Sequence, residues 1–270
     1  MANPAFNNSP AFSAKAAQRA AQRGQVPAVP TPDQLEEHFG LPSATEVQTE
    51  RMSYEDTIFK TFAGFAVLLV GAAIGWIFPA LAIVGGVVGF ALALVNIFKK
   101  TPSPALVLLY ALAEGLLVGG VSSFYATLWD GIIPIALFGT LGVVGVTLAL
   151  FASGKVRASK RATQIFLVAL IGYAAFSLVN VGLMLFGVTD SMFGLRDQEI
   201  FGIPLGIPLG ILVVLLGAYS LVLDFEQVKR GVETGQPRIY GWTAAFGIIV
   251  TVVWLYLEIL RLASYFLPRS

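Results

Sequence analysis

The sequence contains no cysteine and only one histidine, His38. These absences exclude Cys/His zinc sites, thiolate nucleophiles, disulfides and imidazole-based catalytic triads. Charge is also scarce, because only 12% of the 270 residues are charged and 56% are hydrophobic, whereas about 25% of an ordinary soluble domain is charged. The formal net charge of +1 gives no global electrostatic reason to bind nucleic acid, and we expect no such partner.

Two further absences bear on catalysis. Gly154 and Lys155 are followed by Val156, so the chain has no phosphate-binding loop of the Gly-x-x-x-x-Gly-Lys-Ser/Thr type. No Gly-x-Gly-Asp motif of the presenilin type occurs, and a rhomboid-type serine protease would need a histidine beside its serine. We therefore expect a protein that is not an enzyme and that holds no cofactor.

Long uncharged runs are what the sequence does have. Residues 61–98 carry no charge over 38 positions, nearly twice the length of about 20 residues that one helix needs to cross a bilayer. Pro79 stands at the midpoint of this run and divides it into two helices. Because unpaired backbone groups are costly in lipid and no strand-like alternation occurs, the spans must be helices. The predicted fold is all-α, a bundle of seven transmembrane helices at about 57–78, 80–98, 104–125, 131–153, 162–187, 204–230 and 241–267.

The first 52 residues differ in composition from the rest. They are rich in Ala, Asn, Pro, Ser and Gln, which predicts a disordered tail with one short helix at 32–39, where Pro32 could occupy the first helical position. Ser53-x-x-Asp56 has the spacing of a capping box. We therefore expect the transmembrane domain to cover residues 53–267.

Lysine and arginine predict the orientation, because they accumulate in cytoplasmic loops. Fourteen of the 17 would lie on one side of the seven-span arrangement, and they are residues 15, 19, 23, 51, 60, 99, 100, 155, 157, 160, 161, 229, 230 and 238. The opposite side has only Arg196 and Arg269, with Arg261 inside the seventh span. The prediction is a cytoplasmic N-terminus and an outside C-terminus.

Small residues and prolines suggest how the spans pack. Gly71-x-x-x-Gly75 and three similar pairs are typical of close helix packing in membranes. Pro204 and Pro208 stand four residues apart before the sixth span. They predict either an N-terminal proline cap or a broken helix that lines a cavity.

Three acids fall inside predicted spans, where a charge costs about 2.5–3.5 kcal/mol on insertion scales. Glu114 is either a buried protonated acid or a functional group. Asp224 precedes Gln227 on one helix face and is either a solvated interfacial carboxylate or a functional one. Glu258 either forms a salt bridge with Arg261, three residues later, or takes part in function.

Three segments carry a family resemblance. Asp224-Phe225-Glu226-Gln227, Leu255-Tyr256-Leu257-Glu258 and the segment from Glu114 to Tyr125 resemble the Bax inhibitor, or transmembrane Bax inhibitor motif, family in its bacterial branch. The resemblance implies a seven-helix bundle with the last helix at its centre, acting as a pH-sensitive calcium leak. It also implies that Asp224 and Glu258 share a proton and gate the path, with Lys99 as a basic partner; Glu114, Gln227 and Arg261 are further possible partners.

The chain departs from the family pattern around this pair of acids. The family has Asp where Glu258 stands and Asn where Arg261 stands, and a guanidinium next to an acid opposes a shared proton. At about 1.5 Å per residue, Glu258 lies roughly 25 Å along the seventh helix from Gly241, whereas Asp224 lies only about 9 Å from the end of the sixth. The two acids can meet only if the seventh helix begins well outside the membrane, and we expect it to begin at Tyr240 or Trp242.

The main hypothesis is therefore a calcium leak pathway in the plasma (inner) membrane. Its partners would be membrane lipid and calcium, the latter bound transiently, because Ca²⁺ prefers several oxygen ligands. A non-conducting membrane regulator is the alternative, whose N-terminal tail would engage a protein such as a membrane protease or a stress factor. A proton-coupled solute carrier is a third possibility, although the two halves show no inverted repeat.

Overall fold

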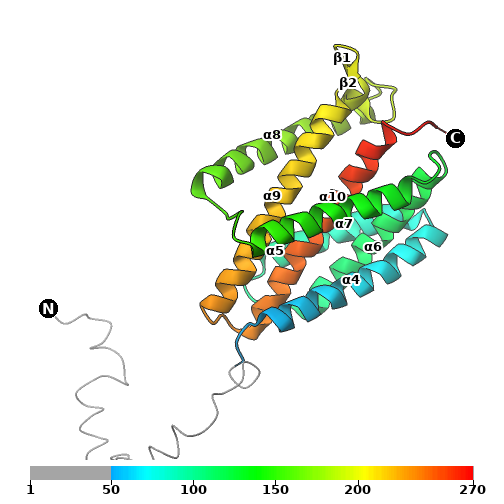
Figure 1. Ribbon diagram of the computed structural model, residues 1–270. Helices are drawn as coiled ribbons and strands as arrows, with labels where there is room; N and C mark the ends of the chain where they lie inside the picture. Colours follow the sequence, from blue (N-terminus) through cyan, green and yellow to red (C-terminus); the bar gives the residue numbers. More distant parts are fainter. Residues whose placement is uncertain (1–49, 270) are drawn as a thin grey trace, which may run out of the picture. The chain divides into compact units, whose positions relative to one another are not determined.

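The computed structural model describes residues 50–269, and the chain there forms seven long helices (Figure 1). All seven are long and apolar enough to cross a membrane, which confirms the predicted fold. Each begins and ends within three residues of its expected span. The helices are α4 (Tyr54–Ile77), α5 (Leu81–Phe98), α6 (Pro104–Ala126), α7 (Ile132–Ala152), α8 (Lys160–Leu185), α9 (Gly206–Glu233) and α10 (Gly241–Ser264).

Local chemistry explains the helix ends. The Ser53 hydroxyl accepts a hydrogen bond from the Asp56 amide and caps α4, as the capping-box spacing predicts. Ser159 caps α8 in the same way, through the amide of Ala162. Pro79 lies between α4 and α5 and separates them into a hairpin. These boundaries follow from the sequence because each depends on residues within one helical turn.

Small residues let three helices approach closely. Side chains added at Gly71 and Gly75 of α4 would collide with the backbone of α6, and one added at Gly119 of α6 would collide with the backbone of α4. A side chain at Gly85 of α5 would likewise meet the backbone of α6. The glycine pairs are therefore packing surfaces, in keeping with the small-residue rule for membrane helices.

Helix α10 lies at the centre of the bundle. It packs against α9, α4, α7 and α6 and has the largest buried share of the seven helices. Helices α5 and α8 are peripheral, since each has only two buried residues, namely Gly85 and Gly89 in α5 and Phe166 and Asn180 in α8. Most of their apolar side chains are exposed, as expected for helices that face lipid.

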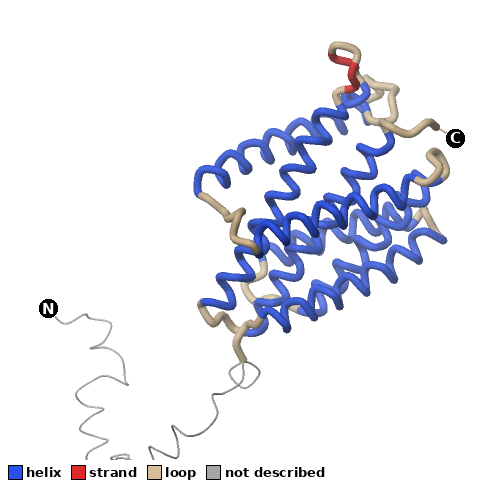
Figure 2. Tube along the Cα trace, viewed as in Figure 1, coloured by secondary structure: helices blue, strands red, loops and turns tan. Residues whose placement is uncertain are grey.

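The bundle has two different ends. We call "basic end" the end where α4, α8 and α10 begin and α5, α7 and α9 finish. The opposite end carries the loop between α8 and α9, which contains the short helix η1 (Gly194–Asp197) and a hairpin of β1 (Glu199–Ile200) and β2 (Ile203–Pro204), shown in red in Figure 2. Pro204 belongs to this hairpin and Pro208 lies in the first turn of the unbroken α9, so the proline-cap interpretation is confirmed.

The predicted tail needs one correction. Residues 50–52 belong to the folded part, because the Met52 amide donates to the Gln236 carbonyl at 2.7 Å and the Arg238 amide donates to the Glu50 carbonyl at 2.7 Å. Met52 is buried. The expected disordered tail was therefore placed about three residues too far along the chain, while the rest of it, with the expected helix at 32–39, lies outside the described residues.

Candidate functional site

Asp224 lies where α9 packs against α10. Its Oδ2 accepts a hydrogen bond from the Thr251 hydroxyl at 2.7 Å, and the Ser220 hydroxyl lies 3.2 Å from that same Thr251 oxygen. A side chain at Gly247 would place its Cβ 3.0 Å from the other carboxylate oxygen, so the glycine leaves room for the acid. The carboxylate and two hydroxyls form a group of oxygens between α9 and α10.

Asp224 is partly buried and has no cationic neighbour in salt-bridge range among residues 50–269. It lies nine residues, or about 14 Å, before the end of α9, within the segment long enough to span a membrane. A carboxylate placed there without a counter-ion is costly. Its hydrogen-bond donor is the Thr251 hydroxyl, which stabilises the carboxylate without cancelling its charge.

Glu258 has very different surroundings. Its side chain is nearly inaccessible and holds two arginines and a tyrosine. Arg196 Nη1 lies 2.8 Å from Glu258 Oε1, while Arg261 Nη1 at 3.0 Å and the Tyr173 hydroxyl at 3.1 Å donate to Oε2. Each oxygen therefore has its own donors, and the carboxylate is fully compensated.

The expected shared proton between Asp224 and Glu258 is wrong for this structure. Thr251 marks the level of Asp224 on α10, and Glu258 lies seven residues, or about 10 Å, further along the helix. Helix α10 does begin at Gly241, beside the expected Tyr240 and Trp242, but this start still leaves the acids at different levels. The salt bridge between Glu258 and Arg261, one of the alternatives from the sequence, is present.

Three other expected partners lie elsewhere. Lys99 is exposed at the end of the peripheral α5 and has no ion pair among the described residues, so it is not a partner of either acid. Glu114 faces α5, where a Cβ at Gly89 would lie 2.9 Å from its Oε1. Gln227 is exposed at the basic end of α9.

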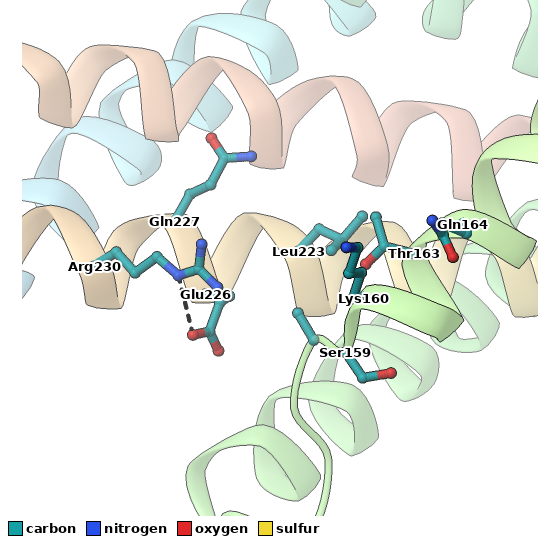
Figure 3. A pocket seen from close by; sticks show the side chains of 9 residues that line it. Ser159, Lys160, Thr163, Gln164, Leu223, Glu226, Gln227 and Arg230 are labelled. Carbon is teal, nitrogen blue, oxygen red and sulfur yellow. Dashed lines mark hydrogen bonds and ion pairs between the residues drawn. The ribbon is translucent and has the colours of Figure 1, made fainter.

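Gln227 lines a pocket of about 590 Å³ between the start of α8 and the end of α9. Figure 3 shows the Gln227 side chain on the other side of α9 from Glu226, which pairs with Arg230. Lys160 and Arg230 give this pocket a basic wall. It lies at the basic end of the bundle and is lined by neither Asp224 nor Glu258.

Sequence reasoning missed Arg196 and Tyr173. Arg196 is the lone arginine of the α8–α9 loop, on the side where basic residues are otherwise almost absent. Only 4% of it is exposed. The position of Arg196 in the sequence could have indicated its role, because a single arginine on the side that lacks other basic residues suggests an ion pair with an acid inside the bundle.

A second missed cluster ties α4 to the loop before α10. Lys60 is buried, donates to the Arg238 carbonyl at 2.6 Å and forms an ion pair with Asp56. Arg238 Nη2 also lies 2.7 Å from Asp56 Oδ1. With the backbone pairing of residues 50–52, these contacts fix the start of α4 to the start of α10 at the basic end.

The fold and these sites define a multi-pass helical membrane protein with acids on the central helix α10 and on its neighbour α9. The sequence profile of the "Bax inhibitor 1 like" family matches residues 3–267, nearly the whole chain. This chain therefore belongs to the Bax inhibitor 1 like family, as the resemblance indicated. No curated protein and no solved structure matches it.

Proposed function

We propose that this protein is a calcium leak pathway in which Asp224 is the cation-binding acid. The observation that carries the proposal is the position of Asp224, inside a membrane-spanning helix, facing α10, with two hydroxyls nearby and no counter-ion among residues 50–269. A calcium leak is consistent with the family. Glu258 has no part in binding the cation, because two arginines already occupy its oxygens.

The ligands near Asp224 favour the passage of a calcium ion over its stable binding. Ca²⁺ takes six to eight oxygen ligands in stable sites. The described residues hold no group of three or more acidic or imidazole side chains placed to bind one metal ion, so a cation at Asp224 would have one carboxylate, the hydroxyls of Ser220 and Thr251, and water. Such a site binds weakly and releases readily. Because a proton and a cation compete for the same carboxylate, acid should reduce the flux and higher pH should increase it.

The experiment is calcium flux into liposomes that contain the purified protein and a trapped calcium dye, measured at several pH values. Wild type should pass calcium faster at higher pH. Asp224→Asn should abolish most of the flux and its pH dependence. Glu233→Gln is the matched control, since Glu233 is an exposed acid in the last turn of the same helix, and it should conduct like wild type. Equal flux from wild type and Asp224→Asn would refute the proposal.

We also propose that the bundle lies in the plasma membrane with its basic end in the cytoplasm. The support is the placement of Lys99, Lys100, Arg157 and Lys160 at one end of the bundle. Because the native chain has no cysteine, Lys100→Cys and Arg269→Cys each introduce a single thiol. In intact cells, a membrane-impermeant maleimide should label only the Arg269→Cys protein, and labelling only of Lys100→Cys would reverse the orientation.

A membrane regulator is the second candidate. The observation that favours it is the pairing of residues 50–52 with the loop that leads into α10, the central helix. Deleting residues 2–49 would then remove the effect of the protein in cells while calcium flux in liposomes stayed absent in both forms. Wild-type flux that Asp224→Asn abolishes would contradict this candidate.

A further inference from the structure

The loop between α8 and α9, residues 186–205, folds back over the end of α10. Asn180 at the end of α8 holds it through two hydrogen bonds, one donated to the Phe193 carbonyl at 3.1 Å and one accepted from the Leu195 amide at 2.6 Å. The Phe193 ring packs against the rings of Tyr125 and Tyr265. This loop is an ordered cover, which we call the lid.

Arg196 is the residue of the lid that enters the bundle. Its Nη1 lies 2.8 Å from Glu258 Oε1 and its Nη2 donates to the Tyr173 hydroxyl at 2.7 Å. One side chain thus joins the lid to α10 and α8. A second contact to the lid comes from the Tyr265 hydroxyl, which donates to Asp197 at 3.0 Å.

The two arginines on Glu258 have different consequences. Arg261 is on the same helix as Glu258, so its ion pair holds no other element in place. The ion pair of Arg196, in contrast, joins the lid to α10. Because Arg196 alone contacts Oε1 while Arg261 and Tyr173 contact Oε2, Glu258 would keep a counter-ion if Arg196 left.

That arrangement makes separation of the lid feasible. Breaking a buried ion pair is costly chiefly because it leaves one charge uncompensated. Here Glu258 would stay paired with Arg261, and Arg196 would move with its loop into water. Helix α8, which anchors the other side of the lid, has only two buried residues and is lightly held.

We propose that the lid is a gate over this end of the bundle and that the Arg196–Glu258 ion pair is its latch. Thr251 and Glu258 lie on one face of α10 two turns apart, so the face that contacts Asp224 leads toward the latch. A gate presupposes a pathway, and this inference therefore rests on the proposed calcium leak. Its test measures access to the covered end of α10, which does not depend on ion flux.

The reporter is Ser264→Cys, a near-isosteric change in a chain without cysteine. Ser264 is buried and precedes Tyr265, which contacts the lid. The protein is placed in lipid nanodiscs, which expose both ends, and its reaction rate with a membrane-impermeant maleimide is measured. Arg196→Gln should raise this rate about tenfold, because loss of a charge-assisted contact favours local opening.

Arg261→Gln is the matched control, because it also removes one guanidinium from Glu258 but leaves the lid connected. Its labelling rate should stay within about twofold of the wild-type background. If both variants accelerate labelling equally, loss of either positive charge near Glu258 is enough to explain the effect, and the latch is overturned. An unchanged labelling rate in Arg196→Gln would also overturn it.

If Arg196→Gln does not fold, Arg196→Lys tests the latch instead. Lysine keeps the charge but cannot reach Glu258 and Tyr173 together, so labelling should accelerate by a smaller factor, and an unchanged rate would overturn the latch. Calcium flux measured on the same proteins separates the two proposals. If Arg196→Gln accelerates labelling but the wild-type protein passes no calcium, the leak alone is refuted. If the wild-type protein passes calcium but Arg196→Gln leaves the labelling rate unchanged, the latch alone is refuted.

Discussion

Asp224 and Glu258 are acids on the neighbouring helices α9 and α10, yet their surroundings are opposite in kind. Glu258 carries Arg196 and Arg261 on its two oxygens and is almost fully buried. Asp224 is only partly buried and contacts a hydroxyl from the neighbouring helix. The comparison shows that one acid is neutralised by cations and serves structure, whereas the other has a hydroxyl donor and no ion pair among residues 50–269; on the proposed function, this difference leaves Asp224 available to an ion.

The largest effect should come from Glu258→Gln. This variant leaves Arg196 and Arg261 without their carboxylate, and breaking a buried pair by removing one partner costs about 3–5 kcal/mol. Thermal unfolding in detergent, compared with wild type, measures this loss. Asp224→Asn is the contrasting variant and should change stability by less than about 1.5 kcal/mol, since it breaks no ion pair and the Asn oxygen can still accept the hydrogen bond from Thr251. Similar losses of stability in both variants would contradict the proposed difference between the two sites.

The next effect concerns Thr251→Asp, which would give Asp224 a second carboxylate in contact. Two such groups do not both ionise readily, so one proton should be held up to a higher pH. Calcium flux in liposomes should then need a higher pH, by about one unit or more. Thr251→Asn, of the same size and without charge, should leave the pH dependence of flux close to that of wild type. The same shift in both variants would mean that Asp224 is not the group that titrates.

The smallest effect should come from Tyr173→Phe. It removes a hydroxyl that donates to Glu258 and accepts from Arg196, while both ion pairs remain. The expected loss of stability is about 0.5–1.5 kcal/mol, the usual net value of a hydrogen bond. Thr163→Val, which removes a hydroxyl contact of the same helix with Tyr219, is the control for a general weakening of α8. A loss as large as that of Glu258→Gln would show that the hydroxyl, rather than the arginines, stabilises the acid.

Local features of the sequence predicted the architecture. The uncharged runs, the Ser53 cap and the break at Pro79 each depend on neighbouring residues, and all three are present in the structure. The glycine pairs also predicted where helices pack closely, because only residues without a side chain permit the backbone contacts between α4 and α6.

The site was only half predictable, because it depends on contacts between distant segments. The cost of charge in lipid singled out Asp224 and Glu258 as acids that need a structural or functional reason. Which group faces each acid depends on how far α10 is shifted along the axis of α9 and on the path of the α8–α9 loop. Neither can be predicted from residues close together in the sequence. Lys99 was assigned by resemblance, but the peripheral position of α5 places it away from both acids.

The central claim is that only the uncompensated acid serves ion passage. Its most direct test is calcium flux in liposomes for wild type, Asp224→Asn and Glu258→Gln, each verified as folded and inserted in equal amount. The account predicts that Asp224→Asn loses the flux and its pH dependence, while folded Glu258→Gln still conducts. Loss of flux in Glu258→Gln together with wild-type flux in Asp224→Asn would contradict it.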